Sequence, residues 1–126
     1  MIVLLDTNAF MMPAQCRIDL FGELRNLLGA FEPVVVPAVL DELAGLARGR
    51  GRDAAAARLG LALTNRCTVV DSPDMSARVD DQILAYAEKN RCLVATNDRE
   101  LRETLLSRGI GVISLKNNTK LEIFRR

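Results

Sequence analysis

Short apolar runs alternate with amphipathic helical patterns along almost the whole chain, and this alternation limits the possible folds more than any other feature. The apolar runs predict strands at residues 2–5, 33–36, 68–70, 92–95 and 112–115. Apolar residues at helical spacing predict helices at residues 20–28, 37–46, 54–63, 79–89 and 99–108. Strands that alternate with helices form right-handed crossovers and a mainly parallel sheet. We therefore expect an α/β fold, a three-layer α/β/α sandwich with a central sheet of about five strands.

The chain has the length and composition of one folded domain. It has 126 residues, of which 49% are hydrophobic and 26% are charged, so we expect a single domain over residues 1–126. No apolar run approaches the roughly 20 residues of a membrane-spanning helix. The apolar start, Met1 to Leu5, meets Asp6 without the cationic flank or cleavage site of a secretion signal. These features predict a cytoplasmic protein that does not enter a membrane.

The cysteines and the absence of histidine restrict the chemistry. Cys16, Cys67 and Cys92 cannot all pair within one chain, and none has the spacing of a zinc ribbon, so we expect free thiols in a reducing cytosol. The sequence contains no histidine, which excludes a Ser-His-Asp triad, a histidine-based ribonuclease and a histidine-rich metal site. Acid–base or metal chemistry must therefore come from carboxylates.

Two acidic residues follow the ends of predicted strands. Asp6 comes directly after strand 2–5, and Asp98 lies three residues beyond strand 92–95. Ligands of open α/β sheets bind beyond the carboxyl ends of the strands, so topology alone places both residues on the functional edge. Each also has a structural interpretation, because Asp6 could be a turn residue and Asp98 an N-cap.

Further acids lie in predicted helices. Asp80 and Asp81 head the helix at residues 79–89, where either could be an N-cap, and Glu42 lies about one and a half turns into an earlier helix. The stretch around Glu42 is apolar except for Asp41 and Glu42 itself. Carboxylates are almost never buried unless they are paired or bound to a metal, so Glu42 is the least ordinary of these acids. Periodicity alone does not place Glu42 or Asp80 at the sheet edge.

These acids lie in four short motifs that occur in order between Met1 and about Leu115. The motifs are Leu4-Leu5-Asp6-Thr7-Asn8, Leu40-Asp41-Glu42-Leu43, Val79-Asp80-Asp81-Gln82-Ile83-Leu84-Ala85-Tyr86-Ala87 and Val94-Ala95-Thr96-Asn97-Asp98. No single motif is specific. Together, within an alternating pattern of strands and helices, they resemble the motifs of the PIN-domain nucleases.

The resemblance implies a metal-dependent endoribonuclease that cleaves single-stranded or structured RNA and leaves a 5′-phosphate and a 3′-hydroxyl. It assigns the catalytic and metal-binding roles to Asp6, Glu42, Asp80 and Asp98, with Asn8 and Thr96 as supporting polar residues. Oxygen-only ligation favours hard cations, so we expect Mg²⁺ or Mn²⁺. Such an ion would bind the scissile phosphate and lower the pKa of the attacking water.

Two further acids are candidates under the same resemblance. Aligning Ala85 and Ala87 with the small residues typical of that helix favours Asp80 over Asp81 as the principal ligand. Asp81 is then a cap, a supporting group or an additional metal ligand. Glu100, shortly after the last motif, is a further candidate because an acid often lies there in this family.

The segment from Gly45 to Arg66 contains five arginines and one aspartate, for a local net charge of +4 in a chain of net charge +1. Arg48, Arg50 and Arg52 in this basic segment are candidate RNA contacts, because a guanidinium suits a phosphate. A solvated loop and helix face is the alternative. Aromatic residues make up only 4% of the chain, with no tryptophan, so base stacking is not expected to be the main source of affinity.

Two biological roles fit this interpretation: a VapC-like toxin with an antitoxin partner, or an RNA-processing nuclease with its own partner protein. A homodimer is expected in either case. Met11, Met12 and Pro13 are apolar residues of a predicted loop, and they could pack in the core or form a partner or dimer surface. The segment 121–124 could add an edge strand or pack on the surface.

Two other classes of function remain open. A PIN-fold module could bind RNA or protein without cutting, although a degenerate site usually loses a ligand and the acid set here is intact. A phosphoacceptor signalling domain also fits an α/β chain of this length, with Asp71 as the acceptor and Lys116 as the required lysine. That second alternative leaves the Asp-Thr-Asn motif and Glu42 without a role.

Overall fold

A computed structural model of the chain describes residues 1–73, 75 and 78–126. Within these residues, six strands form one sheet in the order β3-β2-β1-β4-β5-β6. They are β1 (Ile2–Leu5), β2 (Glu32–Val35), β3 (Thr68–Val69), β4 (Leu93–Ala95), β5 (Val112–Lys116) and β6 (Lys120–Phe124). The first five are parallel, and β6 runs antiparallel to β5. The predicted, mainly parallel sheet is confirmed, with one strand more than expected.

Strand β1 is the centre of the sheet and of the core. It pairs with β2 on one side and with β4 on the other, and its residues Val3, Leu4 and Leu5 are fully buried. Strands β2 and β3 lie on one side of β1, and β4, β5 and β6 lie on the other. The strand order therefore reverses between β1 and β4. In open parallel sheets, this reversal point creates the crevice in which ligands bind.

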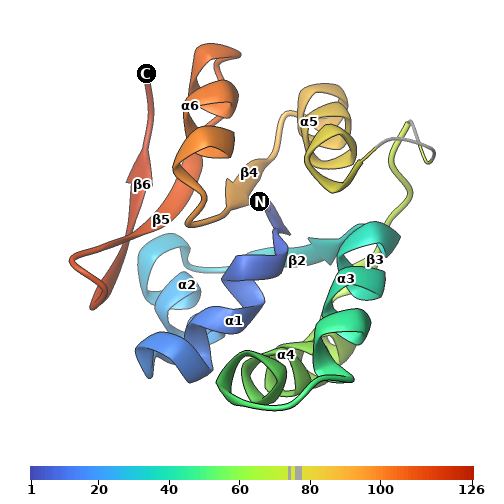
Figure 1. Cartoon of the computed structure of the whole chain (residues 1–126). Coiled ribbons are helices and arrows are strands. Elements are labelled where there is room, and N and C mark those ends of the chain that lie inside the picture. Colours follow the sequence, from blue (N-terminus) through green and yellow to red (C-terminus); the bar gives the residue numbers. More distant parts are fainter. Residues whose placement is uncertain (74, 76–77) are drawn as a thin grey trace.

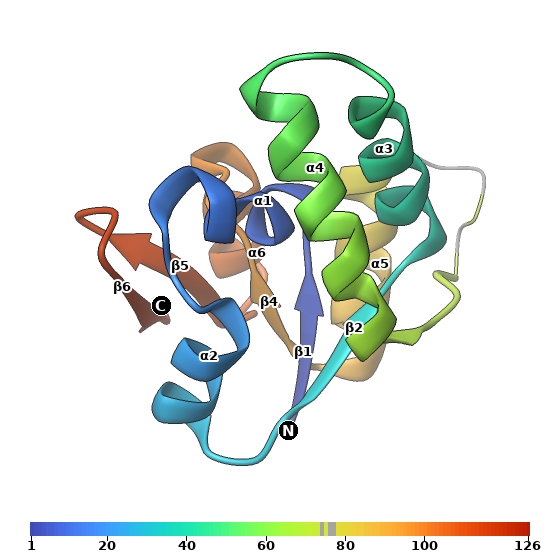
Figure 2. The ribbon, with the colours of Figure 1, turned by 90° about the horizontal axis from the view of Figure 1, so that it is seen from below.

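Helices cover both faces of the sheet, as a three-layer sandwich requires. They are α1 (Thr7–Cys16), α2 (Leu20–Leu28), α3 (Pro37–Ala47), α4 (Arg52–Leu63), α5 (Val79–Asn90) and α6 (Arg99–Ser107), with a short 3₁₀ turn at Thr64–Arg66. In Figure 1, α5 and α6 lie above the sheet and the other four helices lie below it; Figure 2 shows the chain from below, with α4 toward the viewer. None of the helices in the described residues is long and apolar enough to cross a membrane.

Helix α1 replaces the predicted loop after strand β1. Asp6 is its N-cap, because the Thr7 backbone N–H donates a 2.7 Å hydrogen bond to Asp6 Oδ1. The helix continues through Pro13, which sits beyond the first turn and removes only one backbone donor. Met11 and Met12 are buried at 7% and 1% exposure. Core packing is therefore the correct interpretation of these methionines, and a surface patch is not.

The structure also decides three local points. Helix α4 begins at Arg52, two residues before the predicted start at residue 54, after Gly51, whose φ of 95° favours glycine. Neither Asp80 nor Asp81 is an N-cap, because both lie in the first turn of α5 after Arg78. The segment 120–124 is an edge strand, which resolves the alternative left open by its sequence.

Helices α1 and α4 approach closely at Gly60. A Cβ atom at Gly60 would lie 2.6 Å from the Phe10 carbonyl oxygen and 3.0 Å from Phe10 Cβ. Because Phe10 is fully buried and its carbonyl belongs to the α1 backbone, moving either atom away would cost packing energy. The glycine therefore sets how closely α4 packs below α1, which in turn covers the core under β1.

We predict that Gly60→Ala destabilises the protein by about 1–3 kcal/mol, because it overpacks this contact. Gly45→Ala is the matched control: Gly45 also lies in a helix interior, but a Cβ there meets nothing within 4 Å. Relief of backbone entropy should make that variant more stable, by about 0.5–1 kcal/mol. Urea unfolding midpoints of the two variants would test this, and equal shifts of the same sign would contradict the packing argument.

Candidate active site

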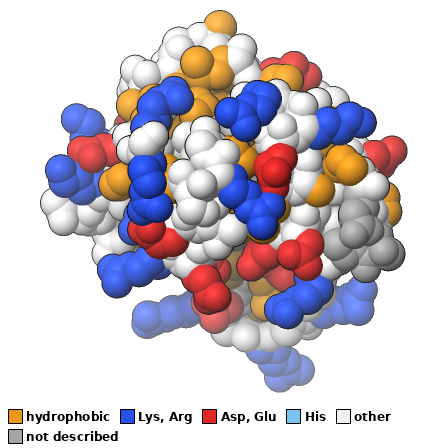
Figure 3. Space-filling model, turned by 90° about the horizontal axis from the view of Figure 1, so that it is seen from above, with side chains coloured by type: hydrophobic (Ala, Val, Ile, Leu, Met, Phe, Trp, Pro, Cys, Tyr) orange, Lys and Arg blue, Asp and Glu red, His pale blue; other side chains and the backbone are white. Residues whose placement is uncertain are grey.

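Four carboxylates line one pocket at the carboxyl edge of the parallel strands. Asp6 follows β1, Glu42 lies on α3, Asp80 lies in the first turn of α5, and Asp98 is the N-cap of α6. We call this the acid pocket; its volume is about 520 Å³. Figure 3 shows acidic side chains gathered on one part of the face that α5 and α6 cover, with basic side chains around them. The structure thus brings together all four acids of the sequence motifs.

The topology explains why these residues meet. Leu5 is paired with Ala95 in the parallel register, and the Asp6 N–H donates a 3.0 Å hydrogen bond to the Ala95 carbonyl. The segments after β1 and β4 therefore leave the sheet side by side. Helix α3 starts at the end of β2, and α5 contacts α3 at the same edge although the two helices cover opposite faces. This contact brings residues 42 and 80 to the strand ends.

Asp6 forms the floor of the acid pocket. It is 4% exposed, whereas Glu42, Asp80 and Asp98 are exposed at its rim. The apolar neighbours of Glu42 suggested that its side chain is buried, but it is exposed. The buried residues of α3 are Val39 and Leu43, and Glu42 lies outside this buried face. Asp41 is exposed as well, but only Glu42 lines the pocket.

Hydrogen bonds hold Asp6 in one orientation. Its Oδ1 accepts from the Thr7 backbone N–H at 2.7 Å, and its Oδ2 accepts from the Thr96 hydroxyl at 2.8 Å and from the Asn8 amide at 3.3 Å. Thr96 is fully buried. Because these donors come from both sides of the strand reversal, the Asp6 carboxylate is fixed relative to β1 and β4 together.

Asn8 and Thr96 extend this network to the loop after β4. Asn8 Oδ1 accepts from the Asn97 backbone N–H at 2.7 Å, and Thr96 Oγ1 accepts from the Asp98 backbone N–H at 3.1 Å. Asp98 Oδ1 in turn accepts from the Leu101 N–H at 3.0 Å, as an N-cap does. The capping role of Asp98 leaves its carboxylate at the pocket rim, so its structural and functional interpretations are compatible.

The acid pocket carries excess negative charge. The pKa of Asp6 is raised from 3.8 to about 6, mainly by burial and to a smaller extent by the charges of Asp80 and Glu42, while the hydrogen bonds from Thr96 and Thr7 oppose the shift. The pKa of Asp80 is also raised, first by burial and then by the charges of Asp98 and Glu42. Arg78 lowers it and is the only cationic residue among those described that line the pocket. A cation bound among these oxygens would offset the repulsion.

The donor set fits a hard divalent cation. The acid pocket offers four carboxylates and no cysteine or histidine among its described lining residues, and carboxylate oxygens are the ligands that Mg²⁺ and Mn²⁺ prefer. Thr7 also lines it, and the Thr7 hydroxyl oxygen is buried without a hydrogen-bond partner among the residues that the structure describes. As the side chains stand, no three acidic or cysteine residues of the described chain are grouped closely enough to hold a metal ion.

Two of the candidate acids lie beside the acid pocket. Asp81 and Glu100 line a neighbouring pocket of about 410 Å³, which shares Asp80 and Arg78 with the acid pocket. Arg78 is not among the site residues predicted from the sequence. Its position two residues before Asp80 could have indicated its place in the pocket. A residue next to the start of a helix lies at the same edge of the sheet as the first turn of that helix.

The arginines of the basic segment have different roles. Arg58 donates a 2.9 Å hydrogen bond to the Ala47 carbonyl at the end of α3, and Arg66 lies 4.3 Å above the ring of Phe21. Both therefore stabilise the fold. Three others are exposed at or between α3 and α4 and do not line the acid pocket: Arg48, Arg50 and Arg52.

Comparison with known proteins identifies the family of the chain. A family model described as a PIN like domain matches residues 3–118. Ribonuclease VapC4 of Methanocaldococcus jannaschii is 33% identical over 124 residues, which cover 94% of this chain and 93% of that protein. Ribonuclease VapC9 of Archaeoglobus fulgidus is 32% identical over 117 residues, or 92% and 84% of the two chains. The solved PIN domain endonuclease Utp24 superposes with a TM-score of 0.80 at 30% identity, covering 99% of this chain and 92% of that one.

The chain is thus an α/β protein whose mostly parallel sheet gathers four carboxylates at its carboxyl edge, and its relatives are nucleases. Within that class, the chain belongs to the PIN-like domain family and is homologous to ribonucleases of this family. Nucleases of the family are generally metal-dependent.

The raised pKa of Asp6 predicts a pH-dependent stability of the metal-free protein. A carboxyl whose folded pKa is about 6 and whose unfolded pKa is near 3.8 favours folding most at low pH, and this contribution is lost as the pH rises from about 4 to about 6. Asp6→Asn removes the titration. The stability of this variant relative to wild type should therefore rise between pH 4 and pH 7, by up to about 3 kcal/mol.

Urea unfolding at pH 4, 5, 6 and 7 in excess chelator would measure this difference. Asp41→Asn, which removes an exposed carboxylate outside the acid pocket, is the matched control. A difference between Asp6→Asn and wild type that stays constant over this pH range would contradict the burial of an uncompensated charge at Asp6.

Proposed function

We propose that the protein is a metal-dependent endoribonuclease that hydrolyses phosphodiester bonds of single-stranded or structured RNA in the acid pocket. The observation that carries the proposal is the convergence of Asp6, Glu42, Asp80 and Asp98 on one pocket, in a chain without histidine. The ribonuclease relatives support RNA as the substrate. The intact acid set favours catalysis over a module that only binds RNA or protein.

The four acids would hold Mg²⁺ or Mn²⁺, which supplies a Lewis acid for the scissile phosphate and lowers the pKa of the attacking water. Asp6 is fixed for this task by Thr96 and Asn8, so its carboxylate needs little reorganisation. Asp81 and Glu100 are proposed as supporting acids, because they line the neighbouring pocket that Asp80 also lines.

Cations of the chain would position the RNA. Arg78 lines the rim of the acid pocket, where its guanidinium can bind a phosphate next to the scissile one. Arg48, Arg50 and Arg52 are proposed as more distant phosphate contacts, because they are exposed and form no ion pair with any described residue. Such contacts hold the strand without reading its sequence.

The relatives support two cellular roles. The VapC ribonucleases favour a toxin that is inhibited by an antitoxin protein, and the likeness to Utp24 favours an RNA-processing nuclease with a different partner. We propose the toxin role first, in the cytoplasm, because both curated relatives carry VapC names. A small antitoxin gene next to this one would support it, and sedimentation of the purified protein would test the expected homodimer.

The cleavage assay compares two neighbouring acids of α3. Purified protein with mixed single-stranded RNA and Mn²⁺ should cut the RNA, and excess chelator should stop the reaction. Glu42→Gln should lower the rate by about two orders of magnitude or more, because a charged metal ligand is lost. Asp41→Asn should stay within about threefold of wild type, because adjacent helix residues point roughly 100° apart and only Glu42 lines the pocket.

Sequencing of the cut ends would show whether the products carry 5′-phosphates. A larger loss in Asp41→Asn than in Glu42→Gln would contradict the assigned face of α3. If wild type does not cleave with Mn²⁺ or Mg²⁺, the protein is a non-catalytic binding module.

Metal binding should also stabilise the folded protein. At Mn²⁺ near 100 times its dissociation constant, a single site contributes about 2.7 kcal/mol and raises the melting temperature. Asp80→Asn should reduce this rise, because the metal-free pocket is then less repulsive and the ion loses one ligand. Thermal scans across millimolar Mn²⁺ measure both, with Asp41→Asn as the control that keeps the full shift; no shift in wild type would contradict a metal site.

A further inference from the structure

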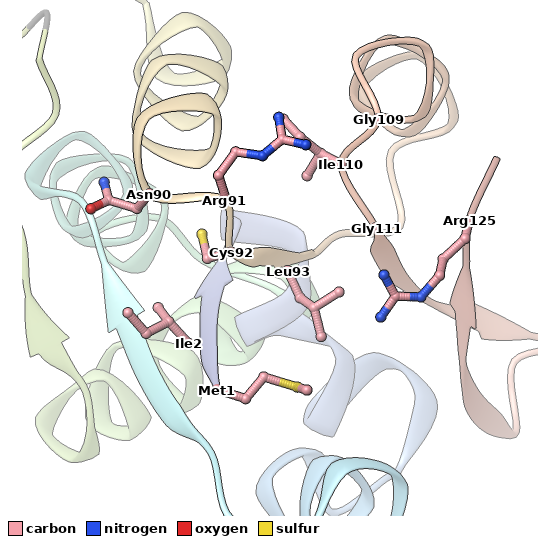
Figure 4. A pocket seen from close by; sticks show the side chains of 10 residues that line it. All are labelled: Met1, Ile2, Asn90, Arg91, Cys92, Leu93, Gly109, Ile110, Gly111 and Arg125. Atoms are coloured by element: carbon pink, nitrogen blue, oxygen red, sulfur yellow. The ribbon is translucent and has the colours of Figure 1, made fainter.

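A second pocket lies at the opposite edge of the sheet from the acid pocket. Its volume is about 510 Å³, and it lies at the amino ends of β1 and β4, against the segment 109–111 that leads into β5. Figure 4 shows its lining side chains. We call it the cationic pocket. It shares no lining residue with the acid pocket, and its function does not depend on the proposed nuclease activity.

Two guanidinium groups give the cationic pocket its charge. Arg91 and Arg125 line it, and no acidic residue among those described does so. Neither guanidinium forms a hydrogen bond or an ion pair with another described residue. By contrast, Arg126, which follows Arg125 in the sequence, forms an ion pair with Glu103. Arg108, which precedes Gly109, forms an ion pair with Glu88. The two charges at the pocket are therefore available to a ligand.

The backbone fixes the position of Arg91. It is the C-cap of α5, where its N–H bonds to the Ala87 carbonyl at 2.8 Å, and its φ is 52°. This left-handed conformation is uncommon for residues other than glycine, asparagine and aspartate. From it, the side chain reaches Gly109, where a Cβ atom would lie 3.8 Å from Arg91 Nη2.

A glycine also makes room for Arg125. A Cβ atom at Gly111 would lie 3.2 Å from Arg125 Nη1 and 2.7 Å from Leu93 Cδ2. Any side chain at this position would displace one of these groups, so glycine lets the guanidinium lie over the start of β5. In Figure 4, Arg91 and Arg125 approach the segment 109–111 from its two sides. The charges thus flank one strip of backbone.

The floor of the cationic pocket is apolar. It is formed by Ile2, Cys92, Leu93 and Ile110, of which the last three are less than 9% exposed. Burial raises the pKa of the Cys92 thiol to about 11, so the thiol stays neutral at physiological pH and does not offset the arginines. Small-molecule sites commonly combine an apolar floor with a few convergent polar groups.

We propose that the cationic pocket binds a small phosphate-bearing molecule, whose phosphate contacts Arg91 and Arg125 and whose neutral body covers the apolar floor. The planar guanidinium fork matches phosphate oxygens in pairs. The volume suits a compact ligand, since small-molecule pockets span about 300–1,000 Å³. A nucleoside monophosphate and free phosphate share this chemistry, and the experiment separates them.

Titration calorimetry in excess chelator would test the proposal, because the acid pocket without metal repels anions. We expect saturable binding of 5′-AMP, weaker binding of inorganic phosphate, and none of adenosine. Arg91→Asn keeps a residue that tolerates the left-handed backbone, and Arg125→Gln keeps much of the side-chain volume. Each should weaken 5′-AMP binding by about tenfold or more, equivalent to about 1.4 kcal/mol.

The controls remove comparable arginines elsewhere. Arg17→Asn changes an arginine with the same left-handed backbone, φ 53°, at the end of α1, and Arg126→Gln changes the residue next to Arg125. Both should bind 5′-AMP within about twofold of wild type, and so should Glu42→Gln, which separates this site from the nuclease proposal. The inference is overturned if 5′-AMP and phosphate do not saturate, if the controls lose as much affinity, or if a short glutamate-rich peptide binds the pocket in their place.

Discussion

The hydrogen bond from the Thr96 hydroxyl to Asp6 joins the two strand ends on which the acid pocket is built. Both residues are buried, and each also organises a helix start: Asp6 caps α1, and Thr96 accepts from the backbone of Asp98, which caps α6. An acid buried at this point costs stability, so the fold surrounds it with donors that leave little freedom for its orientation.

Much of the fold could be predicted because it rests on local periodicity. Five of the strands lie where the apolar runs predict them, since buried parallel strands are apolar on both faces. Helix α1 was missed because Pro13 and a short sequence between polar residues resemble a loop, whereas its stability comes from the Asp6 cap and from buried Phe10. Such tertiary support leaves no periodic signal.

The acid set could be recognised from its motifs, but the side-chain environment could not. The apolar neighbours of Glu42 suggested burial, although it is exposed, because α3 buries a narrow stripe and leaves its other sides open. Arg78 lies in the pocket because α5 contacts α3 at the edge of the sheet where β1 ends. Long-range placement of this kind follows from crossover geometry, which spacing along the chain does not encode.

The two lateral borders of the sheet differ in what they offer to another polypeptide. At one border, β3 has only two residues, both exposed, and gives an incoming extended chain almost no main-chain groups to pair with. At the other, β6 is five residues long, and its antiparallel pairing with β5 leaves its outer side as the longer row of main-chain donors and acceptors. A strand added to this sheet would therefore find more main-chain partners at the C-terminal border than at β3.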